Sequence, residues 1–344
     1  MYKCLFISVN SFKDNTFIVF LLCCEAGHIV RNSKENHLHT HNMKLQTPVT
    51  DAVCKVGISY NDKITMLGSC FSDNIGGQLV NFGFDVCVNP FGTLYNPVSI
   101  LKSVERLISG ERFTEEDCIQ IGAGDERFCS FSHHTSFART TQQEFLENAN
   151  NALENARRHF AQSTKVIITL GTSWCFRNNE SGQVVSNCLK RHPGEFTRER
   201  LSAGETTECL CRIMELCKMA EGKQGTSFVP KQFIFTVSPI RHFKDGAHGN
   251  QISKAGLLLG IEDAINSSQN DCSKEKNCDY FPAYEIMMDE LRDYRFYAED
   301  MCHPSAQAVN YIRERFLNWA LAPSEHGFLE ENIKKFKRES HIVK

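Results

Sequence analysis

Short apolar runs with helical patterns between them constrain the fold of this chain more than any other sequence feature. The runs are Lys63–Leu67, Phe84–Val88, Val166–Leu170 and Phe233–Val237, with a weaker fifth at Tyr280–Tyr284. Runs of four to six residues that are apolar throughout are typical of parallel strands buried on both faces. The sequence therefore predicts an α/β fold, a doubly wound three-layer α/β/α sandwich around a mostly parallel five-stranded sheet.

The segments between these runs favour helices. They cover Pro97–Ile108, Thr140–Ala161, Thr197–Ala220 and Ser305–Leu321. Pro97 suits the first turn of a helix, and Ser305, directly after a proline, suits an N-cap. We expect one α/β domain over residues 43–322, with a charged C-terminal helix or tail over residues 323–344.

The N-terminal region has a different character. Its apolar run Phe17–Cys24 is too short to span a bilayer, and the segment that follows alternates His with other residues. Met43 resembles a natural start, so we expect residues 1–42 to be an extension outside the fold. We expect no transmembrane segment and leave the oligomeric state open.

Composition narrows the class of partner. The chain has 344 residues and a formal net charge of −3, and its Lys and Arg are scattered, which argues against a nucleic-acid partner. Its 16 cysteines are dispersed and form no C-x-x-C pair, which favours a reducing, cytoplasmic location and gives no support for a zinc ribbon. With no phosphate-binding or dinucleotide motif either, we expect no metal and no cofactor.

The residues that follow each strand are candidates for chemistry, because ligands of open parallel sheets bind at the carboxyl ends of the strands. Two adjacent candidate nucleophiles, Ser69 and Cys70, follow the first strand. The other strand ends carry glycine and small polar or ionisable residues: Asn89-Pro90-Phe91-Gly92, Gly171-Thr172-Ser173-Trp174 and Ser238-Pro239-Ile240-Arg241-His242.

A nucleophile needs a base, and the base needs an orienting group. Asp300 and His303 stand three residues apart just before the last amphipathic helix, a spacing that lets the carboxylate fix the imidazole tautomer. Asp245 and His248 repeat this spacing in the predicted loop after the fourth strand. The pair before the last helix is the better candidate because of its position, and the other pair is open to a structural or binding role.

The order of these blocks resembles that of the SGNH (GDSL-type) hydrolases, whose sheet is flavodoxin-like. The chain more closely resembles the GSCFA-domain proteins over about residues 45–320. Four segments carry this resemblance: Leu67–Ser72, Thr169–Trp174, Ser238–His242 and Tyr297–Ser305.

The resemblance implies an esterase-type hydrolase or an acyltransferase acting on an acylated small molecule or glycan. It places Cys70 at the nucleophile position and Ser69 where the GDSL pattern has Asp. The implied oxyanion hole combines the N–H groups of Cys70 and Gly92 with Ser173, which stands where SGNH enzymes carry Asn.

Four further residues are candidates for substrate binding. The resemblance brings in the segment Phe131–Phe137, where we expect His134 to contact substrate. Arg241 and His242 are placed to bind an anionic or leaving group, and His248 is a further candidate. Because the serine and the asparagine of the hydrolases are both replaced, a non-catalytic ligand-binding module is the alternative function.

Overall fold

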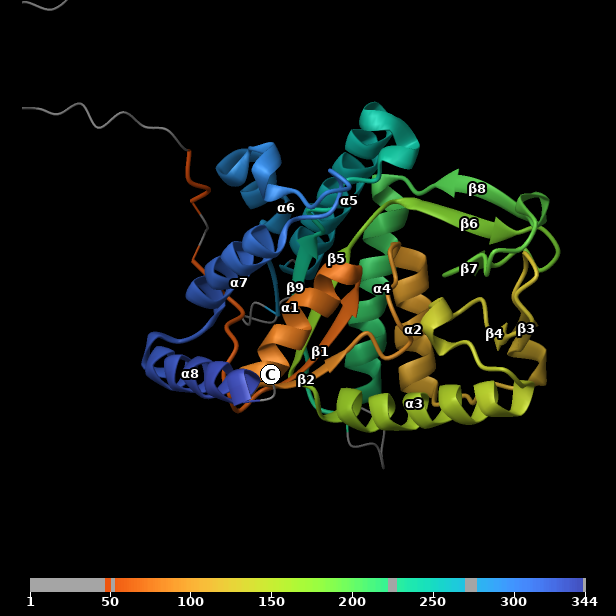
Figure 1. Ribbon diagram of the computed structural model, residues 1–344, viewed down its shortest axis with the longest axis horizontal. Coiled ribbons are helices and arrows are strands. Elements are labelled where there is room, and N and C mark those ends of the chain that lie inside the picture. The colour runs from red at the N-terminus through yellow and green to blue at the C-terminus, as the bar shows by residue number, and fades with distance from the viewer. Residues whose placement is uncertain (1–46, 51–52, 222–227, 270–276, 343–344) are drawn as a thin grey trace, which may run out of the picture. The chain divides into compact units, whose positions relative to one another are not determined.

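In the computed structural model, which describes residues 47–50, 53–221, 228–269 and 277–342, five parallel strands form the central sheet (Figure 1). They are β1 (Lys63–Gly68), β2 (Asp85–Val88), β5 (Lys165–Leu170), β9 (Gln232–Val237) and β10 (Cys278–Tyr280). Their spatial order is β2-β1-β5-β9-β10, and every pairing is parallel. This is the flavodoxin-like order 2-1-3-4-5, and the predicted fold class is confirmed.

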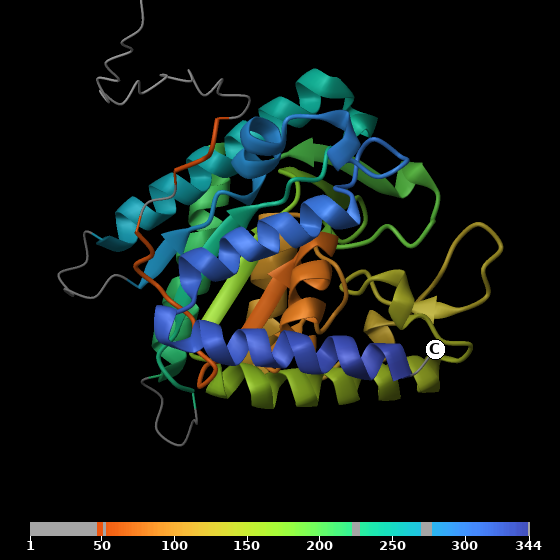
Figure 2. The ribbon, with the colours of Figure 1, turned by 60° about the vertical axis from the view of Figure 1, so that its left-hand side comes forward.

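Alternate side chains of the strands pack on opposite faces of the sheet. One face packs against α2 (Pro97–Ser109), α3 (Gln142–Gln162), α4 (Ala203–Glu221) and α5 (Gly246–Gln269). The other face packs against α1 (Cys70–Asn81) and α7 (Ala306–Ala320), with α8 (His326–Ile342) beside them (Figure 2). The two helical layers bury the sheet, which explains why its strands are apolar throughout.

Two helices were predicted almost to the residue. Helix α2 begins at Pro97, where Asn96 accepts a hydrogen bond from Ser99 N–H, and ends at Gly110, whose φ is 70°. Helix α7 follows Ser305, whose side chain accepts from Ala308 N–H as an N-cap. Local capping residues therefore fix both helices.

Three predicted elements were wrong at their bounds. The fifth strand, predicted at Tyr280–Tyr284, is β10 (Cys278–Tyr280), and the last two predicted residues, Ala283 and Tyr284, begin a helical segment. The helix predicted over Thr197–Ala220 begins only at Ala203, because Phe196–Arg200 form strand β8. The glycine-containing segment after β9 was predicted as a loop, and from Gly246 onward it is α5.

Two small antiparallel sheets were not predicted. Strands β3 (Ile119–Gln120) and β4 (Phe128–Cys129) form a hairpin. Strands β6 (Trp174–Asn178), β7 (Val184–Val185) and β8 pair in the order β7-β6-β8 just beyond the carboxyl end of β5. Most of these strands are too short to leave a clear alternation in the sequence.

The remaining sequence predictions concern the ends of the chain and the membrane. The proposed extension over residues 1–42, with its run Phe17–Cys24, lies outside the described residues. In the part of the chain that the structure describes, no helix combines the length and apolar character that a membrane span requires.

Candidate active site

The two candidate nucleophiles follow β1 directly and lie at the start of α1. Ser69 is fully buried, and its hydroxyl accepts a hydrogen bond from Phe71 N–H as the N-cap of α1. Cys70 is the first residue of the helix and is partly exposed. The structure thus gives Ser69 a capping role and leaves Cys70 as the accessible group.

Opposing influences act on the Cys70 thiol. Burial raises its pKa, and the nearby Asp73 carboxylate raises it further. The backbone N–H groups of Cys70 and Phe71 at the helix N-terminus lower the pKa, as does the positive charge of Lys254. The net shift is upward, so the free protein holds Cys70 mainly as the neutral thiol near pH 7.

Asn89, at the end of β2, ties two strand ends together. Its side-chain oxygen accepts from Gly68 N–H at 2.8 Å, and its amide nitrogen donates to Asp73 at 2.6 Å. Asn89 is buried and has a φ of 41°, a left-handed conformation that asparagine tolerates better than most residues. Its segment was named among the candidate strand ends, but no role was predicted for Asn89 itself.

Gly92 lies against His134 from the insertion after α2. A β-carbon on Gly92 would come 2.3 Å from the β-carbon of His134, so only glycine permits this approach. The Gly92 N–H donates to the Asn89 carbonyl at 2.7 Å, which closes the turn. The Gly92 N–H can therefore contribute to an oxyanion hole only if its hydrogen bond to Asn89 breaks or if it donates to both oxygens at once.

His134, a predicted substrate contact, interacts electrostatically with Asp73, which also acts on Cys70. Its ring nitrogen Nδ1 accepts from Ser136 N–H at 3.2 Å. Burial raises the pKa of Asp73, and the interaction with His134 opposes this rise. The neighbouring His133 points the other way, into a cluster of aromatic rings, and is fully buried. Only His134 of this pair is available to a ligand.

Ser173, the predicted third oxyanion donor, is fully buried after β5. Its N–H donates to the Ser253 hydroxyl at 2.8 Å, and its own hydroxyl lies 3.2 Å from the same oxygen. Ser253 belongs to α5, the helix that was predicted as a loop at its start. Both donors of Ser173 thus already serve to fasten the loop after β5 to α5.

Helix α5 holds the loop after β9 as well. Asn250 accepts a hydrogen bond from His242 N–H at 2.9 Å. Lys254, with a side chain in the core, donates to the carbonyl oxygens of Gly171 and Ser238 at 2.6 and 2.7 Å. Sequence reasoning missed Lys254, although its helical spacing from Leu257 and Ile261 places it on the buried face of the helix.

Asp300 and His303 form the predicted pair. Asp300 accepts from the N–H groups of Cys302 and His303, each at 2.9 Å, and its other oxygen lies 2.5 Å from His303 Nδ1. These hydrogen bonds lower the pKa of Asp300 to about 2. The carboxylate therefore remains charged at neutral pH and orients the imidazole.

Arg241 holds the loop that carries this pair. Its guanidinium donates to the Met301 carbonyl, and its backbone N–H donates to the Cys302 carbonyl at 3.0 Å. The guanidinium also lies 4.2 Å from the centre of the Tyr297 ring. The structure thus supports a positioning role for Arg241. Its predicted role in binding an anion remains a prediction.

The two remaining predicted residues differ in their surroundings. His242 is half-buried in the loop after β9, and burial together with Lys254 lowers its pKa to about 4. His248 is exposed. It was predicted to lie in a loop, but it belongs to the first turns of α5. His242 is therefore a neutral imidazole near pH 7, whereas among the described residues no hydrogen bond or ion pair joins His248 to Cys70.

The predicted residues come together in two groups. Cys70 shares its surroundings with Asp73, Tyr95 and Lys254. His303 forms the second group with Asp300, and its charge acts on His242, which Lys254 also influences. Within the described residues no hydrogen bond joins Cys70 to His303. The two groups are connected only by electrostatic interactions, because Lys254 acts on both Cys70 and His242, and His303 acts on His242.

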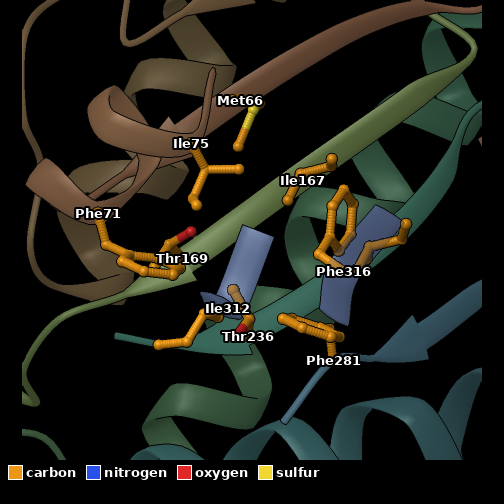
Figure 3. A pocket seen from close by; sticks show the side chains of 10 residues that line it. Met66, Phe71, Ile75, Ile167, Thr169, Thr236, Phe281, Ile312 and Phe316 are labelled. Atoms are coloured by element: carbon orange, nitrogen blue, oxygen red, sulfur yellow. The ribbon is translucent and has the colours of Figure 1, made fainter. Parts of the chain in front are cut away.

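A small cavity lies between the sheet and helices α1 and α7 (Figure 3). Its volume is about 20 Å³, room for one water molecule. Apolar side chains of α1, α7 and the strands line most of it, together with the hydroxyls of Thr169 and Thr236.

The fold and these side chains define a flavodoxin-like α/β protein with an accessible thiol at the carboxyl edge of its sheet. The model of the GSCFA family matches residues 63–316, and the chain belongs to this family. A solved structure, an acetyl xylan esterase (Est2A) from the rumen bacterium Butyrivibrio proteoclasticus, is similar at a TM-score of 0.36 and 9% identity. The similarity covers 79% of this chain and 66% of the esterase, just under two thirds of its length. No curated protein matches the chain.

Proposed function

We propose that this protein is an SGNH-like hydrolase or acyltransferase that cleaves esters through Cys70. The observation that carries the proposal is the position of Cys70, an accessible thiol at the N-terminus of α1 and at the carboxyl edge of the sheet. Helix N-termini favour thiolates and other anions, and ligands bind at this edge of flavodoxin-like sheets. The acyl donor is an acylated small molecule or glycan, and the location is cytoplasmic.

His303 is the general base and acid of the mechanism, and Asp300 orients its imidazole. His303 accepts the Cys70 proton, and the thiolate attacks the acyl carbon and breaks its bond to the ester oxygen. The imidazolium then protonates the departing alkoxide. Water or an alcohol, deprotonated by His303, attacks the thioester and releases an acid or a new ester together with the thiol.

This mechanism requires His303 to approach Cys70, directly or through one water molecule, when substrate is bound. Hydrogen bonds between catalytic groups are often long in free enzymes and shorten in the complex. The Cys70 N–H at the start of α1 is the first oxyanion donor, and the N–H of Gly92 and the hydroxyl of Ser173 are its proposed partners. His134, Arg241, His242 and His248 are the proposed contacts to substrate.

Two observations favour the alternative, a non-catalytic binding module on the same fold. The pKa of Cys70 is raised by burial, and the Ser173 donors are already bonded to Ser253. A protein that only binds its ligand needs neither a thiolate nor a free oxyanion donor.

The test is formation of a covalent thioester on Cys70. The protein is mixed with p-nitrophenyl esters of short acyl groups, quenched in acid, digested and analysed by mass spectrometry. We expect the acyl mass on the Cys70 peptide, its loss in Cys70→Ala, and loss of turnover in His303→Ala. Cys188→Ala, which removes another partly exposed thiol, is the matched control and retains labelling. Binding of esters with no acylation and no hydrolysis supports the binding module instead.

A further inference from the structure

Asp73 is an ionisable side chain at the candidate site that the proposed mechanism does not use. It lies in the first turn of α1, three residues after Cys70, and part of its side chain is exposed to solvent. Residues three apart on a helix share one face, with β-carbons about 5–6 Å apart. Helical side chains also lean toward the N-terminus of the helix, which directs the Asp73 carboxylate toward the turn that begins with Cys70. The carboxylate and the thiol are therefore neighbours on one face of α1.

Asn89 fixes the Asp73 carboxylate from the neighbouring strand. Its amide nitrogen donates to Oδ1 of Asp73 at 2.6 Å, and its amide oxygen accepts from Gly68 N–H at 2.8 Å. Asn89 is itself buried, in a turn that the hydrogen bond from Gly92 N–H closes. The strand ends therefore hold the carboxylate in one place, and its Oδ2 accepts no hydrogen bond from the residues that the structure describes.

The negative charge of Asp73 has no cationic partner in the described part of the chain. Several other carboxylates pair with a cation, as Asp245 does with Arg198. Among the described residues no lysine, arginine or histidine forms an ion pair with Asp73. The amide of Asn89 is neutral, so it positions the negative charge without cancelling it.

The other ionisable groups near Cys70 do not remove this charge. Lys254 is 1% exposed, and burial lowers its pKa to about 7, so it offers no accessible full positive charge at neutral pH. Burial raises the pKa of Tyr95 above its usual value, which keeps that phenol neutral. His134 interacts with Asp73 and can balance its charge only when the imidazole is protonated. The accessible charge beside the thiol is therefore negative once His134 has lost its proton.

We propose that Asp73 is a specificity-determining residue that selects an acyl donor with a positively charged group beside the ester and disfavours an anionic one. The inference deepens the proposed function and rests on it, because it takes Cys70 as the residue that meets the ester. A fixed charge attracts and orients a substrate group of opposite sign and repels one of like sign. An ammonium group next to the ester oxygen approaches the free Oδ2 of Asp73 while the acyl carbon faces the thiol.

The test uses three methanethiosulfonate reagents: the cationic trimethylammonioethyl, the anionic sulfonatoethyl and the neutral methyl compound. The Cys70 thiolate attacks the sulfenyl sulfur, a disulfide forms and methanesulfinate leaves, and mass spectrometry of the Cys70 peptide gives each rate. We expect the ratio of the cationic to the anionic rate to fall about tenfold in Asp73→Asn at low salt, because a unit charge about 6 Å away changes each rate about threefold. A change in the pKa of the thiol alters all three rates alike and leaves this ratio unchanged.

Two variants and a salt titration serve as controls. Asp73→Glu keeps the charge and should keep most of the ratio. Asp85→Asn removes an exposed carboxylate at the first residue of β2, the opposite end of that strand from Asn89, and should leave the ratio unchanged. Salt at about 0.5 M should lower the ratio in the unmodified protein, because it screens exposed charges. The salt titration needs no variant, so a ratio that salt does not change overturns the inference even where Asp73→Asn fails to fold.

Two esters of acetic acid separate the inference from the proposed function. The choline ester and the 3,3-dimethylbutyl ester have nearly the same shape and differ in charge, so kcat/KM should favour the choline ester about threefold or more, and not in Asp73→Asn. Ester turnover with equal kcat/KM for the two, or with an unchanged reagent ratio in folded Asp73→Asn, overturns the inference alone. A lowered reagent ratio in Asp73→Asn without acylation by any ester overturns the proposed function and leaves the charge selectivity of the site standing.

Discussion

The backbone of Gly92 and the side chain of His134 are in contact at a distance that no other residue at position 92 allows. A β-carbon there would lie 2.3 Å from that of His134, and the φ of Gly92 is +82°. This contact attaches the insertion that carries His134 to the loop after β2, beside Cys70.

Gly92→Ala should therefore displace His134 and destabilise the protein. The left-handed backbone alone costs about 1–3 kcal/mol in a non-glycine residue. Gly124→Ala is the matched control, because Gly124 has a φ of +78° and nothing within 4 Å of the added carbon. Urea unfolding should show a larger loss for Gly92→Ala than for Gly124→Ala. Equal losses of unfolding free energy in the two variants would mean that the insertion carrying His134 can move away from the added carbon without destabilising the protein.

Arg241→Met should loosen the loop that holds Asp300 and His303, because the hydrogen bonds from the guanidinium to the Met301 carbonyl are lost. We expect the His303 amide to exchange with deuterium about tenfold faster or more, by mass spectrometry or NMR. Arg295→Met is the control, since Arg295 is an exposed arginine on the same segment that pairs with Asp293. If exchange at His303 does not change, the guanidinium is free for the predicted anion-binding role.

Thr236→Val should stabilise the protein. The Thr236 hydroxyl is buried at the cavity and has no hydrogen-bond partner, which costs about 1–3 kcal/mol. Its neighbour across the strands, Thr169, accepts from the Ser72 hydroxyl at 2.7 Å, so Thr169→Val should destabilise. Denaturant midpoints of the two variants measure the difference in sign. A loss of stability in Thr236→Val would indicate a bound water molecule at its hydroxyl.

Acid should weaken the fold through His133. Burial lowers the pKa of this histidine to about 3, below its usual value near 6.5. Between these values the unfolded chain binds the proton and the folded chain does not, so the free energy of unfolding falls as the pH falls. The slope from one such group is at most about 1.4 kcal/mol per pH unit.

His133→Gln should flatten this dependence between pH 6.5 and 4, measured by urea unfolding at several pH values. His242, with a pKa lowered to about 4, adds a similar dependence, which His242→Gln removes as a control. The His133 ring protons should also show no titration by NMR above pH 4. A titration midpoint near 6 would contradict the prediction.

The sheet was predictable because its signal is local. Each of the four clear runs matches a strand to within one or two residues, and the capping residues Asn96 and Ser305 define the starts of α2 and α7. The segment that was predicted as a loop shows the limit of this reasoning. Gly246 and Gly249 weaken helix propensity, but α5 forms because it packs along α4 and the sheet.

Sequence reasoning can propose candidate residues at the strand ends, but it cannot identify contacts that depend on packing between distant segments. Cys70, His134 and the Asp300–His303 pair follow from motifs. The hydrogen bonds of Asn89 to Gly68 and of Ser253 to Ser173 join residues about 20 and 80 positions apart, and no local pattern encodes them. These contacts engage the backbone N–H groups of Gly68 and Ser173, which the sequence motifs alone would suggest are available to a ligand.

The position of α5 in the sequence determines when, during synthesis, the loops at the strand ends become fixed. Asn250, Ser253 and Lys254 fasten the loops after β5 and β9, and all three are synthesised after those loops. A nascent chain that has emerged from the ribosome only as far as β9 holds Cys70 and four of the five sheet strands but lacks the helix that fixes their ends. Its thiol therefore acquires its final surroundings only once α5 has been added, and the later segment with His303 follows after that.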